Sequence, residues 1–181
     1  MVALLLIFLI LVSQFNSIGQ PFIIMTSVIL SLGGAFLGLM VYRQPFGIIM
    51  TGVGVISLAG VVVNNAIILL DYTNKLRQRG MALREAVIAA GATRLRPVVL
   101  TAITTILGLL PMAVGVSFDF RSLSWVVGGE SAQWWGPMAV AVIFGLAVAT
   151  LLTLLVVPVL YAVFSRIKEY MAARFNVETR I

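Results

Sequence analysis

The chain has 181 residues, of which 61% are hydrophobic and 10% are charged, and its net charge is +6. This composition is far more apolar than that of a soluble domain and argues against a soluble enzyme. The basic residues flank long apolar runs, so the positive charge indicates a membrane protein. We therefore expect a lipid bilayer as partner and no nucleic acid.

Cysteine and histidine are both absent from the sequence. Without them the chain has no disulfides, thiol nucleophiles, imidazole bases or common zinc ligands. The six acidic residues are scattered, which argues against a calcium or magnesium cluster. We expect no catalytic residue, no metal site and no cofactor, and we do not expect an enzyme.

An apolar run opens the chain, and we assign residues 1–15 to part of a transmembrane helix. A spanning helix needs about 20 residues, so this run is too short to cross the bilayer by itself. A signal-peptide core is an alternative, but the run lacks a basic start. We expect that Met1 falls inside a helix that begins upstream, in a longer protein.

Four further transmembrane helices follow in chain order, at residues 21–42, 45–71, 95–117 and 135–165. Between the second and third of these, residues 74–92 combine arginines with apolar residues at helical spacing, which predicts an amphipathic helix on the cytoplasmic surface. The remaining segments are a periplasmic loop at 118–134 and a basic cytoplasmic tail at 166–181. The predicted fold class is an all-α integral membrane protein with five transmembrane helices and one cytoplasmic interfacial helix.

The distribution of basic residues predicts the orientation of these spans. Residues 73–96 and 166–181 contain ten of the twelve lysines and arginines, whereas the opposite side has Arg43 and Arg121. By the positive-inside rule, the segments with ten basic residues are cytoplasmic.

Small residues predict close contacts between helices at two places. Gly34 and Gly38 are four residues apart, a spacing that lets two membrane helices approach closely. The small residues Gly52, Gly54, Ser57 and Gly60 give the span at 45–71 a narrow cross-section in its first half, so we expect it inside a bundle. The alternative reading is that glycine is simply common in membrane helices.

Polar side chains occur on the third and fourth spans near their cytoplasmic ends. Arg94 and Thr101 are seven residues apart, about two turns, and share one helix face. Asn64 and Asn65 lie on the third span and enter the bundle from the same side. Polar groups at this depth are costly and usually serve a transport pathway, so we expect these four residues to form one cluster.

Each of these residue types also has a purely structural interpretation. Arginines at a helix start, such as Arg96, commonly only fix the orientation of the span. Paired asparagines can simply join helices, and the hydroxyls of Thr104 and Thr105 can bond to the backbone of their own helix. The residues alone leave these alternatives open.

Several motifs together resemble the resistance-nodulation-division (RND) efflux permeases of the AcrB-like type. The matching segments are GVVVNNAIILLD (60–71), the basic helix (75–92), RLRP (94–97), Thr101, GLLP (108–111) and LLVVPVLY (154–161). The resemblance extends over essentially the whole chain and covers the last five of twelve transmembrane helices. It implies a secondary active transporter in the bacterial inner membrane that uses proton entry to export its substrate.

The resemblance also implies a role for each residue of the polar cluster. Arg94 and Thr101 match the family's relay arginine and threonine, which respond to two aspartates on the fourth helix, in the missing N-terminal half. The drug-pump branch has a lysine at the position of Asn64, followed by an asparagine that matches Asn65. Because Asn64 carries no charge, we hypothesise that coupling depends on Arg94, with both asparagines ordering the network.

Three classes of function remain in competition. The first is a proton-driven multidrug or solute exporter, which the resemblance implies is a homotrimer docked to a periplasmic adaptor (a membrane fusion protein) and an outer-membrane channel. We favour hydrophobic or amphiphilic substrates, because these spans contain no acid other than Asp71, which lies at the exit of the span at 45–71. Alternatives are a SecDF-like, lipid-exporting or metal-exporting relative, and a passive membrane scaffold.

Overall fold

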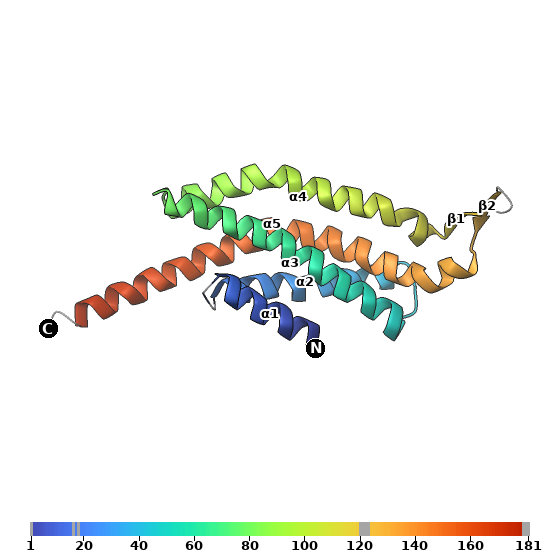
Figure 1. Ribbon diagram of the computed structural model, residues 1–181, viewed down its shortest axis with the longest axis horizontal. Coiled ribbons are helices and arrows are strands. Elements are labelled where there is room, and N and C mark those ends of the chain that lie inside the picture. Colours follow the sequence, from blue (N-terminus) through green and yellow to red (C-terminus); the bar gives the residue numbers. More distant parts are fainter. Residues whose placement is uncertain (1, 16, 18, 120–123, 179–181) are drawn as a thin grey trace.

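The chain folds into a bundle of long helices with one short hairpin at its end (Figure 1). The computed structural model describes residues 2–15, 17, 19–119 and 124–178. Arg121 and Arg180, which we assigned to the loop and the tail, lie outside the described residues. The elements in chain order are α1 (Val2–Phe15), α2 (Gly19–Val41), α3 (Ile48–Gln78), α4 (Leu83–Val114), β1 (Val116–Asp119), β2 (Ser124–Val127) and α5 (Glu130–Glu178).

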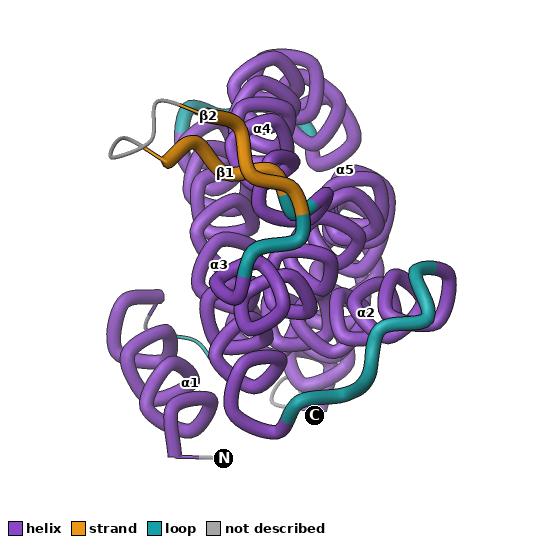
Figure 2. The backbone as a smooth tube through the Cα atoms, turned by 90° about the vertical axis from the view of Figure 1, so that its right-hand side faces the viewer, coloured by secondary structure: helices purple, strands orange, loops and turns teal. Residues whose placement is uncertain are grey.

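Helices α3 and α5 form the centre of the bundle, and α4, α2 and α1 flank it. Figures 1 and 2 both place α4 on one side and α1 and α2 on the other, with α3 and α5 between them. Buried residues from all five helices make one hydrophobic core, which includes Ile24, Leu58 and Leu146. The all-α fold class is thus as expected from the sequence.

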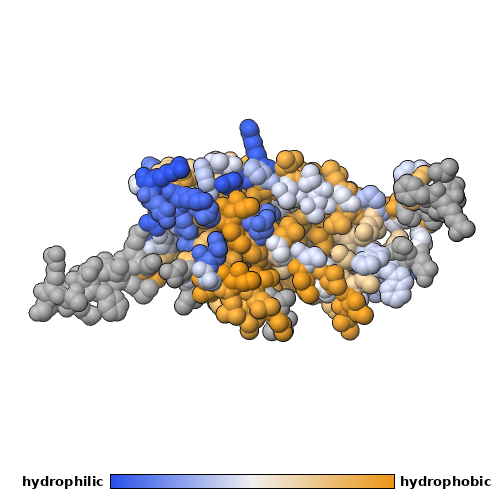
Figure 3. Space-filling model, viewed as in Figure 1, coloured by the Kyte–Doolittle hydropathy of each residue, from blue (hydrophilic) through white to orange (hydrophobic). Residues whose placement is uncertain are grey.

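Four of the described helices are long and apolar enough to cross a membrane, namely α2, α3, α4 and the 132–167 part of α5. Helix α1 is apolar but has 14 residues, fewer than the roughly 20 that a spanning helix needs. Hydrophobic side chains cover the middle of the bundle, and hydrophilic ones gather at the end where α3 meets α4 (Figure 3). This pattern fits a multi-pass membrane protein.

In the structure, the boundary between α3 and α4 differs from the one predicted from the sequence. Residues 74–92 are not a separate helix, because α3 continues to Gln78 and α4 begins at Leu83. Gly80 lies in the turn with a φ of 88°, which glycine adopts easily. We had placed a helix start near Pro97, but α4 continues through it, as membrane helices often do at proline.

The segment predicted as a polar loop contains an antiparallel hairpin of β1 and β2. Val116 pairs with Val127 and Phe118 pairs with Trp125, so one face of the hairpin is apolar. The rings of Phe118 and Trp125 pack edge to face with centroids 5.2 Å apart. The sequence gave little sign of this pairing, because each strand has only four residues and the apolar residues of β2 do not alternate with polar ones.

Glycines allow α5 to approach α2 and α3 closely. A Cβ added at Gly34 would lie 2.6 Å from Val148 Cβ, and one at Gly38 would overlap Phe144. On α5 itself, Gly145 faces α3, since a Cβ added there would overlap Leu58 Cδ2. In a bilayer such close backbone contacts, rather than the hydrophobic effect, favour association of helices.

Gly52 and Gly60 do not make such contacts within the described part of the chain. A Cβ added at either position meets no atom within 4 Å. On α3 it is Gly54 that contacts a neighbour, since its added Cβ would lie 3.2 Å from Met138 of α5. Gly52 and Gly54 are two residues apart, so they point to different sides of the helix.

The two adjacent glycines of α2 offer a matched test of this packing. We expect Gly34→Ala to lower the free energy of unfolding of the full-length protein by about 1–3 kcal/mol, because the methyl group overpacks the contact with α5. Gly33→Ala should be neutral or slightly stabilising, since nothing lies within 4 Å there and alanine favours helix. Thermal unfolding in detergent measures both, and equal effects would contradict the packing role.

Candidate functional site

Asn64 and Asn65 are neighbours on α3 but face different surroundings. Asn65 is buried, with a relative exposure of 5%, whereas Asn64 is exposed. The difference follows from the helix, because successive residues are rotated by about 100° around its axis. Asn65 therefore contributes to the inside of this bundle, and Asn64 faces outward.

Arg94 lies about three turns into α4, which begins at Leu83, and packs against the last part of α3. Its guanidinium carbon is 4.7 Å from the ring centroid of Tyr72, a cation–π distance. The Nε atom of Arg94 is buried and has no hydrogen-bond partner among the described residues. The aromatic ring thus holds the cation in place without neutralising its charge.

Asp71 is next to Tyr72 in the sequence, yet it does not pair with Arg94. Its carboxylate accepts a bond of 2.7 Å from Lys75 Nζ, one turn along the same helix. Both side chains are about half exposed, so the pair adds only a few tenths of a kcal/mol. Within the described chain, no carboxylate forms a salt bridge with Arg94.

The threonines of α4 bond to their own helix backbone. Thr101 Oγ1 donates to the carbonyl of Pro97 at 2.8 Å, and the hydroxyls of Thr104 and Thr105 donate to the carbonyl of Thr101 at 3.0 and 2.8 Å. This was the structural alternative for Thr104 and Thr105. The hydroxyl oxygen of Thr101 can still accept a hydrogen bond, and its side chain is exposed.

The predicted four-residue cluster is therefore not joined by hydrogen bonds within the described chain. Arg94 is partly buried against Tyr72, Asn65 is buried, and Asn64 and Thr101 are exposed. Sequence reasoning missed Tyr72, because its contact with Arg94 depends on how α3 and α4 are rotated across the turn. A tyrosine at the end of a span gives no local sign of that rotation.

A second polar group joins three helices at the same end of the bundle. Asn74 of α3 exchanges two hydrogen bonds with Gln20 of α2, at 3.0 and 3.2 Å, and accepts a bond of 2.7 Å from the Tyr161 hydroxyl of α5. Arg77 Nη1 donates to Ser165 Oγ close by. We call Gln20, Asn74 and Tyr161 the three-helix network.

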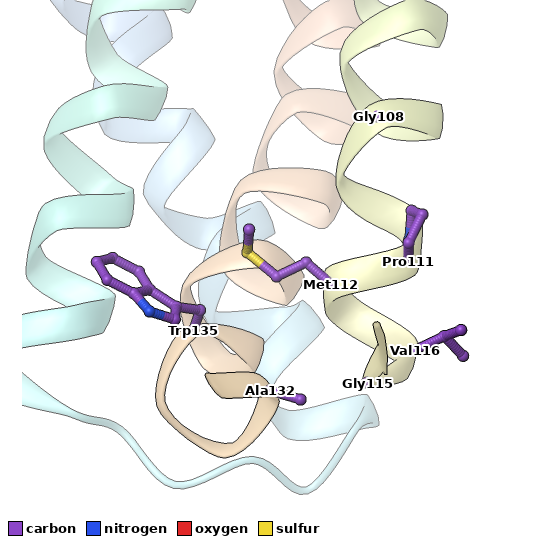
Figure 4. Close-up of a pocket in the computed structure, with 7 residues that line it drawn as sticks. All are labelled: Gly108, Pro111, Met112, Gly115, Val116, Ala132 and Trp135. Carbon is purple, nitrogen blue, oxygen red and sulfur yellow. The ribbon is translucent and has the colours of Figure 1, made fainter. Parts of the chain in front are cut away.

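The opposite end of α4 borders an apolar pocket of about 300 Å³ (Figure 4). Met112 extends from α4 toward α5, Val116 points outward, and Trp135 comes from the first turns of α5. The lining residues are Gly108, Pro111, Met112, Gly115, Val116, Ala132 and Trp135. None of them can ionise or act as a nucleophile, so this pocket offers packing surface rather than chemistry.

Long apolar helices, glycine-based packing and polar groups between spans define a helical multi-pass membrane protein. Residues 1–165 match the profile of the AcrB/AcrD/AcrF family. The chain therefore belongs to this family of RND efflux permeases.

The names of similar proteins refer to different functions. The chain is 38% identical over 168 residues to the cobalt-zinc-cadmium resistance protein CzcA of Cupriavidus metallidurans and 36% identical over 167 residues to the swarming motility protein SwrC of Bacillus subtilis. It is 30% identical over 164 residues to the multidrug resistance protein MdtC of Erwinia tasmaniensis. These alignments cover 90–93% of this chain but 15% of each relative.

The fold is similar to part of a solved heavy metal efflux pump. In crystal form II of that pump, the match has a TM-score of 0.74 at 32% identity. It covers 90% of this chain and 14% of the pump. The chain thus spans about one seventh of the length of its known relatives.

The three-helix network can be tested by removing its central residue. We expect Asn74→Leu in the full-length protein to reduce the free energy of unfolding by about 1–3 kcal/mol, because Gln20 and Tyr161 lose their partner in a part-buried site. Gln78→Leu removes an exposed amide from the same end of α3 and should have little effect. Thermal unfolding in lipid nanodiscs would show whether the two variants differ, as the network requires.

Proposed function

We propose that this chain provides the responding half of the proton-coupling site in an RND efflux permease. The supporting observation is Arg94, a cation held on a membrane helix, about three turns from its first residue, with no carboxylate partner in the described chain. An uncompensated charge at this depth is expensive. A carboxylate from another part of the permease would lower that cost, as two opposite charges attract strongly away from water.

The burial pattern of α4 supports this role. In its most apolar stretch, 11% of the residues are buried inside the chain, compared with 50% for each of the other three spans. Helix α4 carries both Arg94 and Thr101 and lies at the side of the bundle away from α1 and α2 (Figures 1 and 2). This side would pack against the N-terminal half, which would bring the titrating acids.

In the proposed mechanism, the ionised acids attract Arg94, and their protonation releases it. Tyr72 keeps the guanidinium against α3 when the acids are neutral, so the Arg94 side chain has two alternative partners. The exposed Asn64 and Thr101 would hydrogen-bond to the acids or to water between them. A change of partner at Arg94 would shift α4 relative to the acids, which links proton entry to a conformational change.

Hydrophobic or amphiphilic compounds are the substrate class that we propose. The likeness to MdtC supports it, as do spans in which acidic side chains are absent between residues 44 and 70 and between residues 86 and 118. Metal ions are the second candidate, favoured by the likeness to CzcA and to the heavy metal efflux pump. The whole permease would work in the inner membrane as a homotrimer with an adaptor and an outer-membrane channel.

Substitution of Arg94 tests the coupling role. We expect Arg94→Gln in the full-length permease to reduce proton-driven efflux by at least about tenfold, because a neutral side chain cannot respond to the acids. Arg96→Gln removes the same charge from an exposed position two residues away and should retain most of the efflux. Dye efflux from energised vesicles, at matched protein levels, measures both. Normal efflux by the Arg94 variant would exclude the proposed coupling.

A substrate panel separates the two candidate classes. Expression of the full-length permease in a pump-deficient host should raise the tolerated concentration of lipophilic dyes and detergents about fourfold or more. Tolerance to zinc, cobalt and cadmium should stay within about twofold of the empty-vector host. The reverse pattern would show a metal exporter while leaving the role of Arg94 open, since proton coupling does not depend on the cargo.

A further inference from the structure

A second pocket lies at the basic end of the bundle, between the first turn of α2, the end of α3 and α5. Its volume is about 330 Å³. It lies next to the three-helix network, since Gln20 and Tyr161 belong to both. The lining residues are Ser17, Gly19, Gln20, Ile23, Arg77, Tyr161, Phe164, Ser165 and Ile167.

One part of this pocket is suited to an anion. Arg77 brings a guanidinium group, and its Nη1 donates to the hydroxyl of Ser165, which also lines the pocket. Gln20 and Ser17 add an amide and a second hydroxyl. Arginine with neighbouring hydroxyl and amide donors is a common arrangement for binding a phosphate group. Among the described residues that line the pocket, none is acidic.

The other part of the pocket is apolar and open toward the surroundings. Ile23 is buried at its base, whereas Phe164 and Ile167 are 40% and 48% exposed. A free phosphate ion would gain nothing from such a surface. A phospholipid would, because its acyl chain could lie along the two exposed side chains while its headgroup contacts Arg77.

The position and the charge of this end of the molecule agree with a lipid ligand. Ten of the twelve basic residues belong to segments at this end, and the positive-inside rule makes it cytoplasmic. Anionic phospholipids are attracted to basic surfaces there, and basic pockets between transmembrane helices are known to hold their headgroups. The pocket therefore lies where such lipids would be concentrated.

We propose that this pocket binds an anionic phospholipid, with its phosphate group at Arg77 and Ser165 and an acyl chain along Phe164 and Ile167. The lipid contacts α2, α3 and α5 at once, so it links the same helices as the three-helix network. Bound lipid therefore holds the basic end of the bundle together. This site is separate from Arg94, which belongs to α4 and contacts Tyr72.

Lipid titration of the full-length permease tests this proposal. The purified protein is delipidated in detergent, titrated with phosphatidylglycerol and followed by native mass spectrometry and by thermal unfolding. We expect Arg77→Gln to weaken the tightest phosphatidylglycerol site about tenfold, the effect of losing one hydrogen bond to a charged group. Arg79→Gln, with the same charge change at an exposed position outside the pocket, should stay within about twofold of the unsubstituted protein.

A second variant leaves Arg77 in place. Ile167→Glu puts a negative charge at the half-exposed edge of the pocket and should weaken the tightest site at least as much as Arg77→Gln does. Unfolding without added lipid checks that each variant is folded, and a variant that is not folded is replaced by the other. Equal losses in Arg77→Gln and Arg79→Gln would indicate diffuse surface attraction and overturn the proposal. So would displacement of the lipid by millimolar inorganic phosphate, because that would identify a site for the free ion.

Discussion

A charged side chain near the hydrocarbon region needs a partner, because little water is available there to solvate it. Arg94 illustrates this constraint, since its partner within the described chain is the face of Tyr72 and not a carboxylate. An aromatic face stabilises a cation but leaves its charge in place. The guanidinium is therefore fixed by α3 and still able to attract an acid from elsewhere, which is what a coupling residue requires.

The rest of the bundle provides a firm support for this residue. Helix α5 packs closely on α2 through Gly34 and Gly38 and on α3 through its own Gly145. The three-helix network fastens the same three helices at their basic end. Within this chain, the most apolar stretch of α4 has a smaller share of buried residues than the corresponding stretches of these three helices.

Much of this architecture could be predicted from the sequence, because long apolar runs mark the spanning helices. The orientation drawn from the arginines stays a prediction. The start of α4 was harder to predict. Proline is common in the first turn of a helix, but Pro97 lies inside α4, as membrane helices tolerate. Gly34 and Gly38 do lie at a close contact, whereas Gly52 and Gly60 do not. A glycine pattern shows where a close approach is possible, but not which face of a helix meets a neighbour.

The candidate site was predictable to a similar degree, and for a related reason. The resemblance pointed to Arg94 and Thr101, but nothing local pointed to Tyr72, Asn74 or Tyr161. The contacts of Asn74 with Gln20 and Tyr161 join residues 54 and 87 positions apart in the sequence. Such contacts depend on how complete helices are rotated against one another, and a single sequence does not record those rotations.

The two polar regions at the basic end fall on different sides of the bundle, and this separation has a mechanical consequence. Arg94 and Tyr72 lie where α4 meets α3, while the pocket at Arg77 lies between α2, α3 and α5. A lipid in that pocket would strengthen contacts among the helices that stay together and add none to α4. Lipid binding and proton coupling would thus act on different helix pairs. The lipid would stabilise the contacts among α2, α3 and α5 without restraining α4, the helix that shifts in the proposed mechanism.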